Sequence, residues 1–167
     1  MQIIDNKVLV LRTRDPNRIT TTIKKSTELS HEDGVTEVAV FWGLQEAQTL
    51  RRLGVKNVPS PIDRDYNWPG IFKPMAHQKE TASFLTLNTR AFCFNEQGTG
   101  KTASAIWAAD YLLTQGAVKR VLVVCPLSIM QAAWQADLFK FAVHRTVDVA
   151  YGERNKRKAI INGLADF

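Results

Sequence analysis

The sequence has little cysteine, and no apolar run in it is long enough to cross a bilayer. Its two cysteines, Cys93 and Cys125, each lie inside a short apolar stretch. Two such residues provide neither a disulfide framework nor a metal site, so we expect buried thiols in a reducing compartment. The first ten residues lack a basic region followed by a long apolar stretch, so we expect no secretory signal. We therefore expect neither a membrane protein nor a secreted, disulfide-stapled domain.

Acidic residues are too few to balance the basic ones, and the deficit is uneven along the chain. Residues 1–70 hold 10 Lys/Arg and 9 Asp/Glu, whereas residues 71–167 hold 12 and 7, which gives net charges of +1 and +5. Four of the basic residues form a local cluster: Arg154, Lys156, Arg157 and Lys158. Such an excess suits a polyanionic partner, but charge alone slightly favours a solvated basic surface.

A length of 167 residues suffices for one domain or two small ones, and the pattern predicts two. Near the N-terminus, two short apolar runs around an Asp-Asn pair are typical of a hairpin. Residues 35–42 predict a strand, and apolar residues at every third position predict a helix over 44–53 that a glycine ends. Residues 55–75 hold four prolines and predict a connector, with a domain boundary near residue 70. Residues 1–70 are therefore predicted to form a small α+β accessory domain.

Residues 71–167 alternate between helical and strand patterns. Helices are predicted over 77–88, 101–115, 129–141 and 156–164, and strands over 90–94, 120–125 and 146–151. The strand segments are almost continuously apolar, which favours a parallel sheet covered by helices on both faces.

The segment NEQGTGKT, residues 95–102, follows a predicted strand and leads directly into a predicted helix. This is the placement that a phosphate-binding loop requires, because the start of a helix presents unpaired N–H groups and the positive end of its dipole. Gly98 and Gly100 let the backbone curl around phosphates. Lys101 would then reach the β- and γ-phosphates, and the Thr102 hydroxyl would bind Mg²⁺.

One letter of this segment departs from the usual pattern, because Asn95 stands where a glycine is expected. Asparagine enters left-handed backbone conformations more readily than other non-glycine residues, so it is tolerable there. The alternative interpretation is a plain strand-to-helix turn with a solvated lysine. The full context of strand, Gly-x-Gly-Lys-Thr and helix favours the nucleotide site.

Three segments together resemble a known family. FNEQGTGKT (94–102), PMAHQKETASFL (74–85) and VLVVCPLSIMQAAW (121–134) are similar to the first motor lobe of superfamily-two DNA helicases, and most similar to Swi/Snf-type translocases, including members encoded by bacteriophages. The resemblance covers residues 71–167. It implies an α/β fold in which this part is the N-terminal part of a RecA-like ATP-binding lobe, a partial parallel P-loop sheet with flanking helices. It also implies ATP and Mg²⁺ as cofactors.

The resemblance assigns roles to single residues. Gln78 matches the glutamine that contacts adenine in the family, and Asn95 fits because the family's loop commonly lacks the first glycine. The residues carried over as catalytic are Lys101 and Thr102, with Thr102 also the Mg²⁺ ligand. The residues carried over as nucleotide-binding are Gln78, Gly98, Thr99, Gly100, Lys101 and Thr102. Pro126, Leu127 and Ser128 match the region that touches the nucleic-acid backbone.

Each match also has a simpler interpretation. Gln78 alone would more often be a solvated helix residue, and Ser128 would more often cap a helix. Core packing is the expected role of Trp107 and Trp134. The basic cluster at 154–158 either follows a phosphate backbone or solvates a surface helix, and the sequence prefers neither.

The family's acidic motif is missing. In the family an Asp-Glu-x-His tetrapeptide or a relative holds Mg²⁺ and positions the attacking water, but none follows residue 101, and a second lobe with its arginine finger is also absent. Such an arginine is worth ~10³–10⁵ in rate. We therefore expect the N-terminal piece of a longer motor, which binds ATP but by itself hydrolyses none above background.

The resulting hypothesis is the ATP-binding portion of an ATP-dependent DNA helicase or translocase, the parent being an ATP hydrolase. The expected partners are DNA, double-stranded and held through its backbone, and the remainder of the motor. We expect a monomer in the cytoplasm, that of a bacterial host if a phage encodes it. Two alternatives stay open: another P-loop enzyme such as a small kinase or GTPase, and a non-enzymatic nucleic-acid or protein-binding module derived from a helicase lobe.

Overall fold

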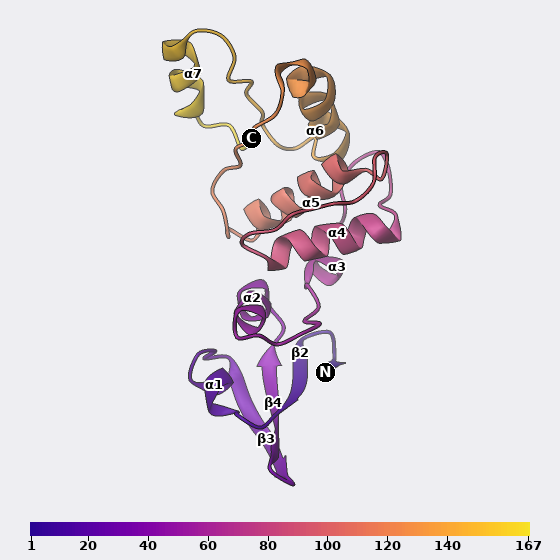
Figure 1. Cartoon of the computed structure of the whole chain (residues 1–167), viewed down its shortest axis with the longest axis vertical. Coiled ribbons are helices and arrows are strands. Elements are labelled where there is room, and N and C mark those ends of the chain that lie inside the picture. The colour runs from indigo at the N-terminus through magenta and orange to yellow at the C-terminus, as the bar shows by residue number, and fades with distance from the viewer. The chain divides into compact units, whose positions relative to one another are not determined.

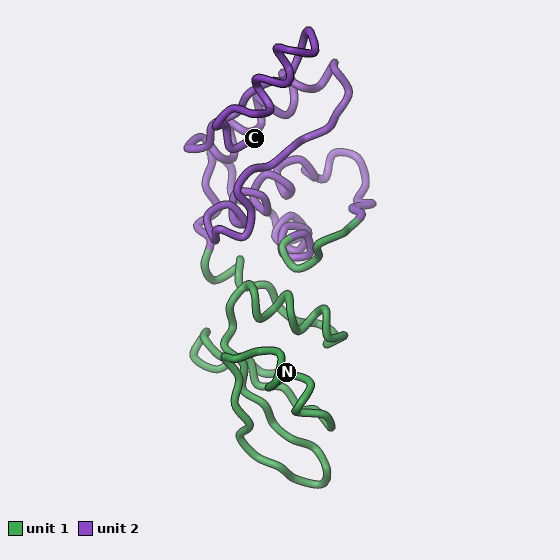
Figure 2. The backbone as a smooth tube through the Cα atoms, turned by 90° about the vertical axis from the view of Figure 1, so that its left-hand side faces the viewer, with its two compact units in different colours: residues 1–65, 86–91 green, residues 66–85, 92–167 purple.

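The computed structural model describes residues 1–167, which divide into two compact units (Figures 1 and 2). Unit 1 comprises residues 1–65 and 86–91, and unit 2 comprises residues 66–85 and 92–167. No helix in either unit combines the length and the apolar character needed to span a membrane.

Unit 1 is built on a four-stranded antiparallel sheet in the order β1-β2-β4-β3. Its strands are β1 (Gln2–Ile4), β2 (Val8–Thr13), β3 (Ser26–Glu32) and β4 (Val35–Phe41). The predicted N-terminal hairpin is confirmed, since β1 pairs with β2 across Asp5 and Asn6, both at positive φ (49° and 52°). Such a turn matches the twist of the strands that it joins.

Helices cover one side of this sheet. α1 (Asn17–Thr20) and α2 (Leu44–Arg52) form this cover through Ile19, Ala47 and Leu50, and α3 (Ile62–Asp65) is the third helix of unit 1. The predicted helix after residue 43 is confirmed, and its fully buried Ala47 and Leu50 pack with Val38 and Val40 of β4 in one apolar cluster. Gly54 ends the turn after α2 at φ +86°, as the sequence predicts.

Unit 2 is helical. It contains α4 (Ala76–Leu87, whose last two residues belong to unit 1), α5 (Lys101–Thr114), a 3-10 turn η1 (Leu127–Ile129), a π-helical segment η2 (Met130–Gln135), α6 (Ala136–Phe141) and α7 (Arg154–Ile161). The core helix is α5. Its Trp107 is buried against Trp68 and Phe141 in edge-to-face contacts, so core packing is confirmed for this tryptophan, whereas Trp134 is only half-buried.

A buried carboxylate fixes the middle of α5. Asp110 is only 1% exposed and accepts hydrogen bonds from Tyr66 Oη (2.5 Å), Arg145 Nε (2.6 Å) and His144 Nε2 (3.0 Å). Burial raises the pKa of Tyr66 far above its ordinary value, and the hydrogen bond to Asp110 adds to that shift. The network ties α5 to the chain on both sides of it.

The predicted RecA-like parallel sheet is wrong. The only sheet is the antiparallel one of unit 1, so the fold is α+β, and the segments 90–94, 120–125 and 146–151 form no strands. Their backbones make only isolated hydrogen bonds, such as Val121 N to Asp166 O at 2.8 Å and Asp148 N to Phe167 O at 3.0 Å. A sheet needs a continuous ladder of lateral partners, and none is present here.

The same segments expose apolar side chains that the sequence predicts to be buried. Phe92 and Phe94 are 82% and 88% exposed, and Leu122 and Val124 are 72% and 88% exposed. Half-buried and exposed residues alternate over 121–125, whereas in 90–94 only Cys93 is half-buried. Cys93 and Cys125 are free thiols and half-buried, which corrects the expectation of fully buried cysteines.

Candidate nucleotide site

The loop before α5 has the backbone shape of an anion cradle. Gly98 and Gly100 both have φ +77°, and Gly100 is the N-cap of α5 in the left-handed conformation. No side chain caps this end of the helix, and its first turn contains no acidic residue. The N–H groups of the first turn therefore face outward without a protein partner, which is the arrangement that attracts an anion.

The two glycines are required for different reasons. A Cβ on Gly98 would meet no atom within 4 Å, so positive φ alone favours glycine there. A Cβ on Gly100 would collide with Nε2 of Gln78 in addition to the strain of its positive φ. Gly100 therefore lets α4 approach the loop closely.

Lys101 is folded back over the loop. Its Nζ donates to the carbonyl oxygens of Glu96 (2.7 Å) and Asn95 (2.9 Å), and the Thr99 hydroxyl closes the loop through a 2.8 Å bond to the Glu96 carbonyl. An ammonium group has three N–H donors, so one donor remains available. The Thr102 hydroxyl, in the first turn of α5, makes no hydrogen bond within the chain.

The start of α4 holds the other side of the loop. Gln78 accepts a bond from Met75 N through Oε1 (2.9 Å) and donates through Nε2 to the Thr99 carbonyl (3.3 Å). The first contact is the return half of a capping box, in which the third helical residue reaches back to the N-cap. His77 Nε2 lies 3.0 Å from the same Thr99 oxygen and donates to it in the tautomer protonated at that nitrogen.

A second contact from α4 fixes the beginning of the loop. The Asn95 side-chain amide donates to Thr81 Oγ1 (2.9 Å), and Thr81 Oγ1 donates to the His77 carbonyl (2.7 Å). Sequence reasoning missed both His77 and Thr81. A usable signal was their spacing, because Thr81 stands four residues after His77 and three after Gln78, and residues three and four apart are neighbours on a helix surface.

The structure brings the predicted nucleotide residues together, with Gln78 contacting Thr99 and Gly100 beside the lysine and threonine that follow. The predicted nucleic-acid residues lie elsewhere. Pro126, Leu127 and Ser128 are exposed at the 3-10 turn, and no hydrogen bond or ion pair joins them to the loop. No side-chain cap is made there, so Ser128 does not serve as a helix cap.

Leu127 lines a hollow of about 590 Å³ in unit 2. Its walls are mainly apolar and come from residues 121–125 and 147–150, from Met130, Trp134 and Leu138, and from part of α7. Two of the segments that the sequence predicts to be strands, 120–125 and 146–151, therefore line this hollow.

The chain contains no group of three or more His, Cys, Asp or Glu residues placed to hold a metal ion. The predicted Mg²⁺ site involves only the Thr102 hydroxyl and the phosphates themselves, and it stays a prediction.

Comparisons with known proteins found no relative. No protein-family model matches the chain, and neither the curated proteins nor the solved structures that were searched contain a match.

Proposed function

We propose that unit 2 binds ATP with Mg²⁺ through residues 95–102, and that the chain is the ATP-binding portion of a DNA helicase or translocase. The observation that carries the proposal is the N-terminus of α5. There two glycines at φ +77° precede an uncapped helix start, and the Lys101 ammonium lies within 3 Å of the loop carbonyls. These are the parts that a triphosphate tail requires.

The site fits an anion for electrostatic reasons. The helix start contributes the equivalent of about half a positive charge, and Lys101 adds a full one. In this structure Lys101 contacts neutral carbonyl oxygens. Phosphate oxygens would form charge-assisted bonds with the ammonium, which are roughly twice as strong as neutral ones. Binding therefore exchanges weaker contacts of Lys101 for stronger ones.

The Thr102 hydroxyl has no competing bond in the chain, which supports its proposed role as a ligand of the Mg²⁺ that accompanies the phosphates. A bound Mg²⁺ would supply charge neutralisation across the phosphates. The role of Thr102 is limited to offering one oxygen ligand from the first turn of α5.

Gln78 keeps hydrogen-bonding capacity for a base. Its amide oxygen accepts one hydrogen bond from Met75 N, and its amide nitrogen donates one to the Thr99 carbonyl. One acceptor site and one N–H donor of the amide therefore remain. An adenine edge presents one donor and one acceptor side by side, which suits these remaining groups. Guanine also presents a donor beside an acceptor, so the preference comes from the match of Gln78 to the adenine-contacting glutamine of helicases. We expect ATP to bind more tightly than GTP, and a GTPase would show the opposite order.

Hydrolysis needs groups beyond this loop. Phosphoryl transfer depends on carboxylates that hold the metal and position water, and on an arginine. The loop has one carboxylate, Glu96, and no ion pair joins it to Lys101. We expect binding of ATP with no turnover above background, measured as phosphate release at steady state. Turnover abolished by Lys101→Ala would contradict this expectation.

Binding is tested with a fluorescent ATP analogue and Mg²⁺. We expect Lys101→Ala to weaken binding at least about tenfold, because a charge-assisted contact contributes roughly 1.5–3 kcal/mol. The matched control is Lys119→Ala, which removes an equal charge from an exposed residue of the same unit that makes no ion pair. Equal binding of the analogue by the unsubstituted chain and by both variants would leave the alternative of a non-enzymatic binding module.

A further inference from the structure

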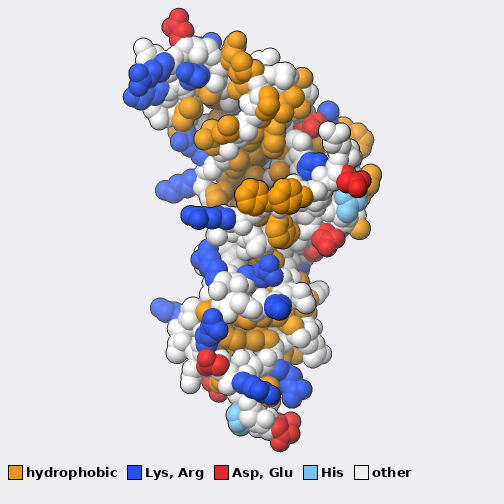
Figure 3. Space-filling model, in the orientation of Figure 1, with side chains coloured by type: hydrophobic (Ala, Val, Ile, Leu, Met, Phe, Trp, Pro, Cys, Tyr) orange, Lys and Arg blue, Asp and Glu red, His pale blue; other side chains and the backbone are white.

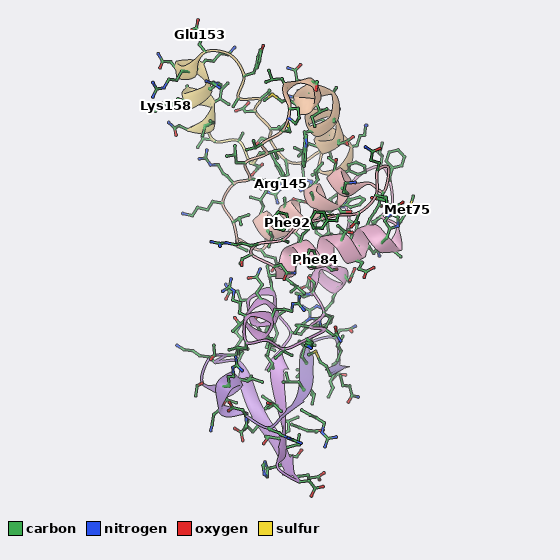
Figure 4. All side chains as sticks on the ribbon, viewed as in Figure 1. Met75, Phe84, Phe92, Arg145, Glu153 and Lys158 are labelled. Carbon is green, nitrogen blue, oxygen red and sulfur yellow. The ribbon has the colours of Figure 1, made fainter.

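The helix α7 carries an unusual concentration of uncompensated charge. Of its eight residues, four are basic: Arg154, Lys156, Arg157 and Lys158. All four are exposed, and none of the chain's seven ion pairs involves them. Lys and Arg side chains gather over α7 at the top of Figure 3, and Lys158 extends from the helix in Figure 4. Like charges this close repel one another unless an anion lies among them.

A fixed contact places this helix on unit 2. Arg120 donates through Nη1 to the carbonyl oxygens of Ile161 (2.9 Å) and Gly163 (2.6 Å), at the C-terminal end of α7. A cation there satisfies carbonyl groups that a helix leaves unpaired and complements its dipole. Arg120 therefore holds the helix and adds one more positive charge to this end of the unit.

The charged face borders the hollow that Leu127 lines. Arg154, Arg157 and Lys158 stand at i, i+3 and i+4, so they share one helix face, and all three border the opening. Leu127 lines the same hollow, so the turn at 126–128 and the basic helix both border it. The sequence alone did not connect these two segments.

Two carboxylates lie near this face. Asp148 lines the hollow, and Glu153 is the N-cap of α7. Glu153 marks the tip of the helix in Figure 4. Four cations against these two anions leave the surface positive, before Arg120 is counted.

We propose that α7 binds the phosphate backbone of duplex DNA, with the turn at 126–128 along the same path. The proposal rests on the DNA-translocase function proposed above and names its DNA-contacting element. From Arg154 to Lys158 the basic residues span about 6 Å of helix axis. That length presents cations to two or three phosphates of a strand, and backbone contacts of this kind carry affinity without sequence preference.

The observations favour DNA over two other polyanions. A membrane surface would need an exposed apolar stripe along the helix, but α7 has a single large apolar residue that is exposed, Ile161 at 48%, beside the half-buried Ile160. Single-stranded nucleic acid would need aromatic side chains among the cations for base stacking. The helix has none, and the exposed aromatic residue closest to it in sequence is Tyr151.

The test compares the salt dependence of DNA binding by the parent and by the triple variant Arg154→Ala, Arg157→Ala, Lys158→Ala. Fluorescence anisotropy follows a labelled duplex of about 20 base pairs over roughly 50 to 200 mM salt. Each lost phosphate contact lowers the slope of log K against log salt by about 0.9, so we expect the slope to fall by about 2 to 3. Across that salt range the parent should lose up to about 40-fold more affinity than the variant.

The matched control removes the same charge from exposed, unpaired basic residues of unit 1: Arg14→Ala, Lys24→Ala, Lys56→Ala. We expect the control to keep the parent's slope. A control that lowers the slope as much as the triple variant would overturn the proposal, because the effect would then follow net charge alone. The single variant Arg157→Glu repeats the test with a smaller change to the helix, and an unchanged slope for both α7 variants would also overturn it.

Two further arms separate the sources of binding. The first arm compares two losses of affinity: that of Tyr151→Ala for a single-stranded oligonucleotide and that of the triple variant for the duplex. A larger loss in the Tyr151→Ala experiment would overturn the assignment to duplex DNA. Binding to phosphatidylserine vesicles without binding to duplex would overturn it as well. The triple variant should bind the fluorescent ATP analogue as the parent does, and Lys101→Ala should keep the parent's salt slope. A chain that binds no nucleotide but shows the α7 effect would disprove the ATP function alone.

Discussion

Gly100 is the residue on which the geometry of the nucleotide loop depends most. It combines a left-handed backbone with the close approach of Gln78 from α4. Gly98 shares the same φ but has open space around it. The two positions therefore separate the effect of backbone strain from the effect of steric contact.

We predict that Gly100→Ala weakens binding of the ATP analogue more than Gly98→Ala does. Both variants force alanine into a left-handed conformation, at a cost of about 1–2 kcal/mol. Only the first displaces the Gln78 amide from its contact with Thr99. Equal losses of affinity for the two variants would mean that the contact with α4 contributes nothing to binding. Dissociation constants by fluorescence titration provide the measurement.

At the scale of elements, the loop depends on the helix beside it. The hydroxyl of Thr81 bridges α4 and the loop, since it accepts from Asn95 Nδ2 and donates to the His77 carbonyl. His77 and Gln78 add two contacts to the Thr99 carbonyl. α4 thus holds both ends of the cradle before any ligand arrives, and this preorganisation lowers the cost of binding.

We predict that Thr81→Val lowers ATP-analogue affinity about three- to tenfold. Loss of a buried hydrogen bond costs roughly 0.5–1.5 kcal/mol, and the loop would then spend less time in its binding shape. Thr81→Ser, which keeps the hydroxyl, should restore most of the affinity. If the serine variant binds as weakly as the valine variant, packing of the methyl group and not the hydrogen bond is responsible. Circular dichroism of both variants checks that the helices persist.

Elements also explain why the predicted parallel sheet was wrong. The segments 90–94, 120–125 and 146–151 have the apolar composition of buried strands. Composition predicts that a segment should be buried but does not supply the neighbouring strands whose backbone groups it must pair with. In the structure those partners are lacking, so Phe92, Leu122 and similar side chains remain exposed.

For the molecule as a whole, buried and hydrogen-bonded acids make stability depend on pH. At high pH the group with the largest pKa shift is Tyr66. Its pKa is raised by burial and by its bond to Asp110, so the folded chain keeps the proton where the unfolded chain loses it. The contribution of Tyr66 to stability is therefore complete below its ordinary pKa of 10.0 and is lost as pH rises above that value.

We predict that thermal unfolding of the parent shifts to lower temperature above about pH 10, and that Tyr66→Phe reduces this shift. Phenylalanine has no proton to lose in either state, so the dependence that belongs to Tyr66 disappears. Calorimetry of parent and variant at several pH values provides the test. An equally steep decline in both proteins would assign the alkaline dependence to other groups.

The contribution of Asp166 to stability depends on pH in the opposite direction. A backbone hydrogen bond from Thr146 lowers its pKa below the ordinary 3.8, and the Arg145 charge adds to this shift. Its contribution to stability is present above 3.8 and is lost as pH falls through the lowered pKa. Unit 2 should therefore be most stable between these acid and alkaline limits.

The sequence by itself determined the local features of this protein. Turn chemistry gave the hairpin at Asp5 and Asn6, three-residue periodicity gave α2, and the pattern of glycines and lysine gave the loop before α5. These features depend on residues that are close in the chain, where backbone conformation and side-chain spacing act directly. The same reasoning placed α4, although not its role as a support for the loop.

Only the tertiary structure decided how distant segments meet. It placed His77 and Thr81 against the loop, set α7 beside the hollow that Leu127 lines, and left the apolar segments without a sheet. Each of these outcomes depends on contacts between residues far apart in sequence. Such contacts follow from the packing of whole elements, and the periodicity of a single segment does not contain that information.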